Sequence, residues 1–371
     1  MKQVLFLSPL PPPFYGSAMS SAMCLDILNQ SEEFAVSSIK LNFAQEIDEM
    51  GRISAAGMMH VLNARKSILK SIRSSKPDLI YIMPATSHWG FLRDYLLSRT
   101  VSRRTNCPVV FHLRSHILER SWKNRFQRKM FQRMYSGNNV ILIDESSRKE
   151  LRDMVREEDI YVLPNAIENE VEEEEFERMF SRRRGREDFF VLFLANMMKT
   201  KGWPKLLEAC RLLNEKGIDF KCTFVGAWMN ERDREEFEEN VASYGLSEKV
   251  MSLGHKKGVE KNRIMASSDV MVFPTEYPHE AFPRVVLEGM MFGLPVIAND
   301  WAAIPNMIEH GRSGFILKEN SPQEIMSSLM KVKDDRELRE ELGRAGRKKF
   351  LECYEREGYG TRFLELLKDI S

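Results

Sequence analysis

The chain has 371 residues, of which 43% are hydrophobic and 29% charged, and its formal net charge at pH 7 is +1. This length suits two domains of about 100 to 200 residues each, and the composition excludes a disordered or fibrous protein. The five cysteines are scattered without a Cys-x-x-Cys pair, so neither a disulfide framework nor a zinc site is predicted. We expect no metal site and no nucleic-acid partner.

The N-terminus begins with a short apolar run, Val4 to Leu7, that is soon followed by prolines. We interpret this run as a first strand rather than a signal peptide. The longest apolar stretch, Phe189 to Met198, is about half the length that a membrane-spanning helix needs. The sequence therefore predicts a cytoplasmic protein.

Short β-branched or aromatic runs alternate with segments of helical periodicity, which is typical of parallel sheets covered by helices. The first series of predicted strands is Val4 to Ser8, Phe34 to Leu41, Leu79 to Met83, Val109 to Leu113, Val140 to Ile143 and Ile160 to Leu163. The second series is Phe189 to Leu194, Phe220 to Val225, Val250 to Leu253, Val270 to Phe273, Pro295 to Ala298 and Phe315 to Leu317.

A Pro-Asn turn and a highly charged stretch separate the two series, as expected at a domain boundary. We predict an N-terminal Rossmann-like domain over residues 1–165 and a second one over 166–345. Residues 346–371 are predicted to be a helical tail, with packing back onto the N-terminal domain as one arrangement.

In open parallel sheets, ligands bind beyond the carboxyl ends of the strands. The first loop of this kind ends at Gly16, where backbone could approach a ligand at a helix N-terminus. The loop that begins at Asn196 carries Lys201 beside Gly202 and Pro204. Lys201 could neutralise a diphosphate, or it could be an ordinary exposed lysine.

The loop after Phe273 contains Glu280, Ala281, Phe282 and Pro283, and the predicted helix that follows contains Glu288. Ionised carboxylates in such positions can accept hydrogen bonds from a sugar diol. The helix N-terminus favours an anion.

Histidines flank the end of a strand in the first series: His112 lies in the strand, and His116 follows Arg114. Each histidine could hold a sugar hydroxyl or move a proton, and each could equally be a core residue.

Basic residues crowd together between Arg93 and Arg133. They are Arg93, Arg99, Arg103, Arg104, Arg114, Arg120, Lys123, Arg125, Arg128, Lys129 and Arg133, opposed there by Asp94 and Glu119. The stretch could be a solvated helix face, or it could meet an anionic membrane or a diphosphate-linked lipid.

At these residues the chain resembles the family-4 retaining glycosyltransferases of the GT-B fold, also called glycosyl transferases group 1. The resemblance rests on Glu280 and Glu288 with seven residues between them, followed by Gly293-Leu294-Pro295-Val296. It continues through Gly311-Arg312-Ser313-Gly314-Phe315. It implies an α/β fold of two Rossmann-like domains whose parallel sheets face each other across a cleft.

The resemblance also implies roles for single residues. Glu288 would hold the donor ribose and Glu280 the transferred sugar, while backbone near Ala281 and Phe282 would reach the sugar and the diphosphate. Lys201 would neutralise the leaving phosphates.

We therefore expect a nucleotide-sugar as donor substrate, no cofactor, and a glycan or lipid-diphosphate-linked acceptor in cell-surface polysaccharide synthesis. The catalytic candidates are Glu280, Lys201 and His112. The donor-binding candidates are Glu288, Ala281, Phe282, Pro283, Gly16 and Asn196, and the acceptor-side candidates are Arg114 and His116.

The chain departs from the family pattern at Asn196 and Arg114, where the family often has an arginine and a histidine, respectively. Two other functions stay open, a nucleotide-sugar epimerase of similar fold and a non-catalytic polyanion-binding protein. The location is expected to be the cytoplasm, with the inner face of the plasma membrane as a candidate site of attachment.

Overall fold

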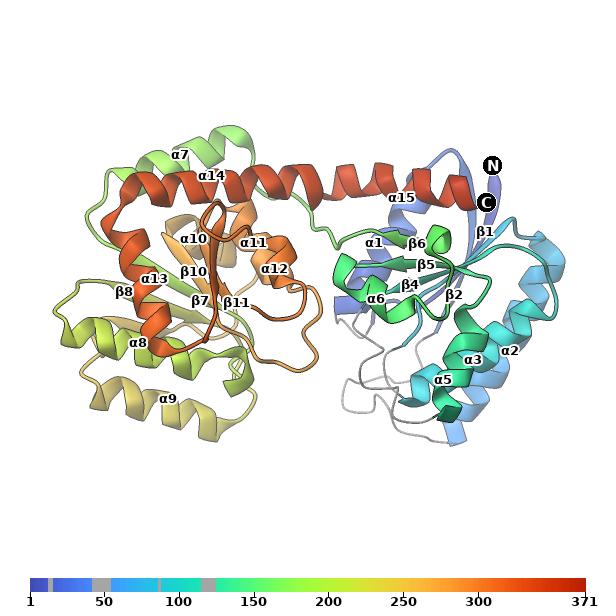
Figure 1. The fold of residues 1–371 in the computed structure, drawn as a ribbon, viewed down its shortest axis with the longest axis horizontal. Coiled ribbons are helices and arrows are strands. Elements are labelled where there is room, and N and C mark those ends of the chain that lie inside the picture. Colours follow the sequence, from blue (N-terminus) through green and yellow to red (C-terminus); the bar gives the residue numbers. More distant parts are fainter. Residues whose placement is uncertain (13–15, 42–54, 86–87, 115–124) are drawn as a thin grey trace. The chain divides into compact units, whose positions relative to one another are not determined.

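The computed structural model describes residues 1–12, 16–41, 55–85, 88–114 and 125–371. The chain divides into two compact units, one formed by residues 1–165 with 359–371 and the other by residues 166–358. Each unit contains a six-stranded sheet in which every pairing is parallel, with helices packed on it (Figure 1). The α/β prediction is confirmed.

The first sheet has the strand order β2-β1-β3-β4-β5-β6. Its strands are β1 (Lys2–Ser8), β2 (Phe34–Lys40), β3 (Leu79–Ile82), β4 (Val109–Leu113), β5 (Asn139–Leu142) and β6 (Ile160–Val162). Its helices are α1 (Gly16–Gln30), α2 (Ala55–Ser75), α3 (His88–Ser102), α5 (Arg125–Tyr135) and α6 (Arg148–Leu151), with most of α15 (Arg356–Ile370).

Side-chain alternation along the strands gives the first sheet two different apolar faces. Leu5 and Leu7 of β1 belong to a core cluster with residues of α2, α3 and α5. On the opposite face, Phe6 stacks on Tyr81 with ring centroids 4.7 Å apart, and Tyr81 meets Phe363 of α15 edge to face. Residues 359–371 thus complete the core of the first unit.

The second sheet has the strand order β12-β11-β10-β7-β8-β9. Its strands are β7 (Phe190–Leu194), β8 (Lys221–Val225), β9 (Val250–Ser252), β10 (Val270–Phe273), β11 (Val296–Asn299) and β12 (Gly314–Leu317). Its helices are α7 (Glu173–Arg184), α8 (Trp203–Glu215), α9 (Glu231–Ser243), α10 (Gly258–Ser267), α11 (Arg284–Met291), α12 (Ile304–Met307), α13 (Pro322–Asp334) and α14 (Arg336–Cys353).

The second sheet is also covered on both faces. One face carries Val191 and Phe193 in a core cluster with α8, α9 and α13. On the other face α11 packs so closely that a Cβ at Gly289 would lie 2.8 Å from the Met271 side chain.

Local sequence signals fix the helix starts in this unit. Ser321 caps α13 by accepting a hydrogen bond from the Glu324 N–H at 3.2 Å, and Pro322 occupies the first turn. The Glu324 carboxylate in turn accepts the N–H groups of Lys318, Glu319 and Asn320. This reciprocal capping explains why the chain turns sharply between β12 and α13.

Among the described residues, no helix is both long and apolar enough to cross a bilayer.

Candidate functional site

The candidate site lies where the second sheet changes its direction of growth. From β7 the chain adds β8 and β9 on one side, and then returns to place β10, β11 and β12 on the other side. The loops that follow β7 and β10 therefore diverge at the carboxyl edge of the sheet. Such a switch point leaves a crevice in which open α/β sheets bind their ligands.

A glycine brings the two loops into contact. After β7 the chain forms a short 3-10 helix, Lys199–Lys201, and Gly202 then adopts a left-handed conformation with φ of 92°. A Cβ at Gly202 would lie 2.2 Å from the Pro274 carbonyl oxygen, so a larger residue could not fit. The Glu276 N–H also donates to the Thr200 carbonyl at 2.7 Å. Lys201 is thus held directly against the loop that carries Glu280.

Lys201 forms an ion pair with Glu280, in which the two side chains are only 15% and 12% exposed. The Lys201 ammonium also lies 4.4 Å from the centre of the Tyr277 ring. Limited exposure reduces solvent screening of this charge, and the ring face attracts it further. Two of the three predicted catalytic residues therefore meet in the structure.

Residues that follow the neighbouring strands hold the Glu280 loop in place. After β11, Asn299 donates to the Thr275 carbonyl at 2.7 Å, and Trp301 donates to the Tyr277 carbonyl at 3.0 Å. After β12, Asn320 donates to the Glu276 carboxylate at 3.2 Å. A hydrogen bond from Lys205 lowers the pKa of Glu276. The loop is therefore preorganised, as a binding site requires.

The helix after this loop begins without a side-chain cap, with Pro283 at the N-cap position of α11. Phe282 is buried, and its ring lies 5.8 Å from that of Tyr354. The Ala281 carbonyl accepts the Ala303 N–H at 3.1 Å. An uncapped helix N-terminus can bind an anionic ligand.

Glu288 lies within α11, and its Oε1 accepts a hydrogen bond from the Lys261 ammonium at 2.9 Å. Lys261 belongs to α10, and no motif in the sequence pointed to it. Asn196, an exposed residue just beyond β7, uses its carbonyl to accept the Met198 N–H. The donor-side candidates of the second unit therefore sit on one carboxyl edge, with a lysine beside each glutamate.

The structure corrects the prediction for His112. Because it is a residue of β4 itself, its side chain points to the sheet face that α15 covers, and it is wholly buried. Its Nδ1 shares a 2.6 Å hydrogen bond with the Tyr81 hydroxyl. Burial, and secondarily the charge of Arg114, lowers its pKa well below the usual range. His112 is a neutral interior residue rather than one that lines a cleft.

Arg114 is likewise an interior residue, only 7% exposed. Its guanidinium donates to the Asn165 side chain, to the Tyr359 hydroxyl at 2.8 Å and to Cys24 at 3.0 Å. These bonds connect Arg114 with α1, with α15 and with Asn165. The contacts explain why an arginine is buried here, and they leave its guanidinium engaged within the first unit rather than with an acceptor.

Gly16 is exposed at the start of α1. His116 lies outside the described residues.

The predicted basic stretch is only partly described, because Arg120 and Lys123 fall outside the described residues. On α5, Phe131 and Tyr135 are buried, whereas Phe126 is 68% exposed. Exposed cations of this helix are Arg125, Arg128, Lys129 and Arg133. Helix α3 packs against both α5 and α2. Helix α2 adds Arg65, Lys66, Lys70 and Arg73 and has no acidic residue.

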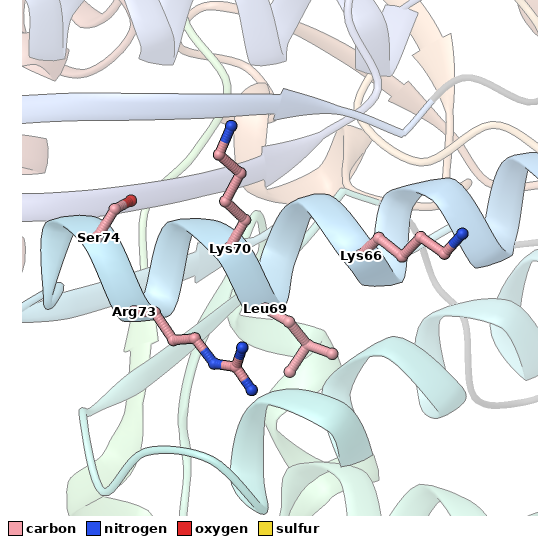
Figure 2. A pocket seen from close by; sticks show the side chains of 5 residues that line it. All are labelled: Lys66, Leu69, Lys70, Arg73 and Ser74. Atoms are coloured by element: carbon pink, nitrogen blue, oxygen red, sulfur yellow. The ribbon is translucent and has the colours of Figure 1, made fainter.

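A hollow of about 440 Å³ lies along α2. Its described lining consists of Lys66, Leu69, Lys70, Arg73 and Ser74, whose side chains point in different directions rather than toward one another (Figure 2). The hollow therefore lacks the convergent polar groups of a substrate site. Within the described residues there is also no cluster of three or more side chains suited to hold a metal.

The second unit is similar in sequence to proteins of a known family. Residues 174–349 match the family model of glycosyl transferases group 1. The amylovoran biosynthesis glycosyltransferase AmsK of Erwinia amylovora is 28% identical over 38% of this chain and 35% of its own length. The capsular polysaccharide biosynthesis glycosyltransferase CapM of Staphylococcus aureus is 23% identical over 58% of this chain and 57% of its own length. The chain thus aligns with about a third to just over half of these relatives.

The crystal structure of Anabaena HepE in complex with UDP resembles the whole chain. The TM-score is 0.73 at 18% identity, with complete coverage of both chains. At this identity the likeness shows the fold, and it confirms the predicted GT-B class. The facing of the two sheets across a cleft stays a prediction.

Proposed function

We propose that the protein is a glycosyltransferase, because residues 174–349 match the family model of glycosyl transferases group 1. It would transfer a sugar from a nucleotide-sugar donor, with retention of the anomeric configuration. The observation that carries this proposal is the contact of Lys201 with Glu280 at the switch point of the second sheet. The contact joins a cation to a carboxylate of the loop that leads into the uncapped α11, and we propose that this carboxylate binds the sugar.

The donor would bind along the carboxyl edge of the second sheet. We propose that the ribose hydroxyls donate to Glu288 and that the diphosphate lies between Lys201 and the N-terminus of α11. UDP bound to the HepE structure supports a nucleoside diphosphate as the ligand class. On binding, the diphosphate would take over Lys201, and Glu280 would then be released to accept hydroxyls of the sugar.

In the transfer step, the bond between the anomeric carbon and the diphosphate oxygen breaks, and the acceptor oxygen bonds to that carbon from the same face. The acceptor hydroxyl loses its proton to the departing phosphate oxygen, as the family resemblance implies. Negative charge develops on the leaving diphosphate. A preorganised cation such as Lys201 therefore stabilises the transition state more than the ground state. We propose that this charge replaces the need for a metal ion.

The proposed acceptor is a glycan or a lipid-diphosphate-linked sugar in polysaccharide synthesis, since the similar protein CapM is a capsular polysaccharide biosynthesis glycosyltransferase. The exposed cations of α2 and α5 support attachment to an anionic surface, because each lysine or arginine near such a membrane contributes about 1 kcal/mol. We propose that the protein works in the cytoplasm at the inner face of the plasma membrane.

A product assay tests this function. The full chain is supplied with UDP-, GDP-, ADP- and CDP-sugars and an extract of lipid-linked glycans. A glycosyltransferase releases nucleoside diphosphate in proportion to the added acceptor, and the release should persist in EDTA. An epimerase would instead produce an isomeric nucleotide-sugar, and a polyanion-binding protein would produce neither. NMR of the product tests retention directly, since an inverted anomeric configuration would refute it.

A further inference from the structure

Two ion pairs in the second unit differ from the others by their burial. In residues 166–358, all of which are described, only Lys201–Glu280 and Lys261–Glu288 keep both side chains below one fifth exposed. The Lys261 and Glu288 side chains are 15% and 16% exposed, respectively. Both pairs contain a glutamate that the proposed function uses. The first lysine has a part in that function, whereas nothing yet explains the second.

Stability alone is a poor explanation for the second pair. A partly buried ion pair loses hydration on both sides, and apolar residues of similar volume often stabilise a protein equally well or better. Helix α10 supplies Lys261 from its first turn, and α11 supplies Glu288 from its interior. The lysine therefore fixes the direction of a carboxylate that would otherwise sample several rotamers.

We propose that Lys261 is a positioning residue that makes the donor site specific for ribonucleotides. This inference rests on the proposed function, in which Glu288 accepts the ribose hydroxyls. Lys261 holds Oε1 at 2.9 Å, and no described residue donates to Oε2. The carboxylate is thus oriented in advance, and Oε2 is left to accept the hydroxyls of the ribose.

Specificity follows from the same geometry. A site built to accept hydrogen bonds from a hydroxyl discriminates strongly against an analogue that lacks it. A 2′-deoxyribonucleotide offers Glu288 one hydroxyl fewer, so it gains less from an oriented carboxylate. Loss of Lys261 should therefore weaken the binding of ribonucleotides more than the binding of deoxyribonucleotides.

Calorimetric titration of the full chain tests the proposal. The probes are UDP, GDP, ADP and CDP, each compared with its 2′-deoxy counterpart. For the nucleotide that binds the wild-type protein most tightly, we expect Lys261→Met to raise the dissociation constant about tenfold. The effect on the deoxy counterpart should be threefold or less, and Lys261→Arg should recover part of the ribonucleotide affinity.

Two controls separate positioning from structure. Lys348→Met removes an exposed lysine that pairs with Glu352 on α14, and it should leave both dissociation constants unchanged. Lys261→Met should unfold at a lower temperature than the wild type, because removing one partner leaves the Glu288 carboxylate uncompensated, but it should still be fully folded at the temperature of the titration. In a Glu288→Gln background, Lys261→Met should have little further effect, since the two residues act as a unit.

Each contrary outcome has a distinct meaning. If no ribonucleoside diphosphate binds the wild-type chain, the proposed function fails and the inference falls with it. If the wild type binds but Lys261→Met binds equally well, the donor site stands and the role of Lys261 is refuted. If Lys261→Met weakens the binding of the ribonucleotide and of its 2′-deoxy counterpart equally, Lys261 does not act through Glu288. The same conclusion follows if the effects of Lys261→Met and Glu288→Gln on the dissociation constant are additive.

Discussion

At the carboxyl edge of the second sheet, Lys201 and Glu280 stay close to the surface and pair with each other. At the corresponding edge of the first sheet, His112 and Arg114 are buried among α1, α15 and the neighbouring strands. Both pairs of residues belong to or follow a parallel strand, yet they serve different purposes. We propose that the first pair binds a ligand, whereas the second pair contacts the C-terminal helix α15.

This difference shows that a residue does not belong to a ligand-binding site merely because it lies at the carboxyl end of a strand. A residue in a loop beyond the strand, such as Lys201, is free of the alternation that the sheet imposes. A residue within the strand, such as His112, must face one of the two covered sides. The following predictions test this contrast, beginning with the largest expected effect.

Replacement of Lys201 should have the largest effect on catalysis. We expect Lys201→Ala to reduce kcat by a factor on the order of 100 to 1000, since it removes one preorganised charge from the leaving group. Steady-state release of nucleoside diphosphate measures this. Lys199→Ala is the matched control, because Lys199 lies in the same loop and pairs with the exposed Glu236. Turnover of Lys201→Ala within a few-fold of wild type would mean that another cation binds the diphosphate.

The cations of α5 provide a test of the exposed surface of the first unit. Replacing Arg125, Lys129 and Arg133 with alanine should weaken binding to anionic vesicles about 100-fold at low salt. The attraction should fall as salt rises, because it decays within a Debye length. Cosedimentation with phosphatidylserine vesicles measures the binding. Replacing Arg178, Arg182 and Arg232 of the second unit is the control. Binding that is equally weak to neutral and anionic vesicles would favour a soluble acceptor.

Glu288 should matter for binding. A hydrogen bond to a charged group contributes roughly 1.5 to 3 kcal/mol. Removing a carboxylate that accepts hydrogen bonds from a diol should therefore weaken donor binding about 30-fold. We therefore expect Glu288→Ala to raise the dissociation constant of the nucleoside diphosphate by about this factor while the protein stays folded. Calorimetry provides the affinity and circular dichroism the fold. An unchanged affinity in the folded variant would remove Glu288 from the site.

His112 should affect stability rather than catalysis. Its folded pKa is lowered by burial, so the unfolded chain binds a proton more readily than the folded chain. The stabilising effect of the neutral histidine is therefore present above about pH 6.5 and is lost as the pH falls below that value. Between pH 7.5 and pH 5.5, the wild type should lose about 1.4 kcal/mol more stability than His112→Gln.

Urea unfolding at the two pH values measures this difference, with the exposed His255→Gln as control. An equal loss of stability in the wild type and in His112→Gln would show that His112 is not held neutral in the interior.

Much of the fold could be predicted from the sequence. All twelve predicted strands occur within two residues of the observed bounds, because short apolar runs between polar turns are a strong signal for buried parallel strands. The Glu280 loop could also be located, since it follows such a strand and precedes a helix. The ion pairs of Glu288 with Lys261 and of Lys201 with Glu280 depend on how separate elements pack. Sequence spacing does not record such contacts.

The errors in the first unit have a physical cause as well. The sequence shows that His112 and Arg114 lie near a strand end, but it does not show which helix covers each sheet face. The covering helix at His112 comes from residues 359–371, more than two hundred residues away. The cluster of Arg114 with Asn165 and Tyr359 could be found only once that helix was placed.

The central claim is that the donor binds at the carboxyl edge of the second sheet. Hydrogen exchange of the full chain, with and without the most tightly bound nucleoside diphosphate among UDP, GDP, ADP and CDP, tests it most directly. The account predicts slower exchange in residues 196–204 and 274–290 when the ligand is present. Protection confined to residues 1–165, with no change in those two segments, would contradict it.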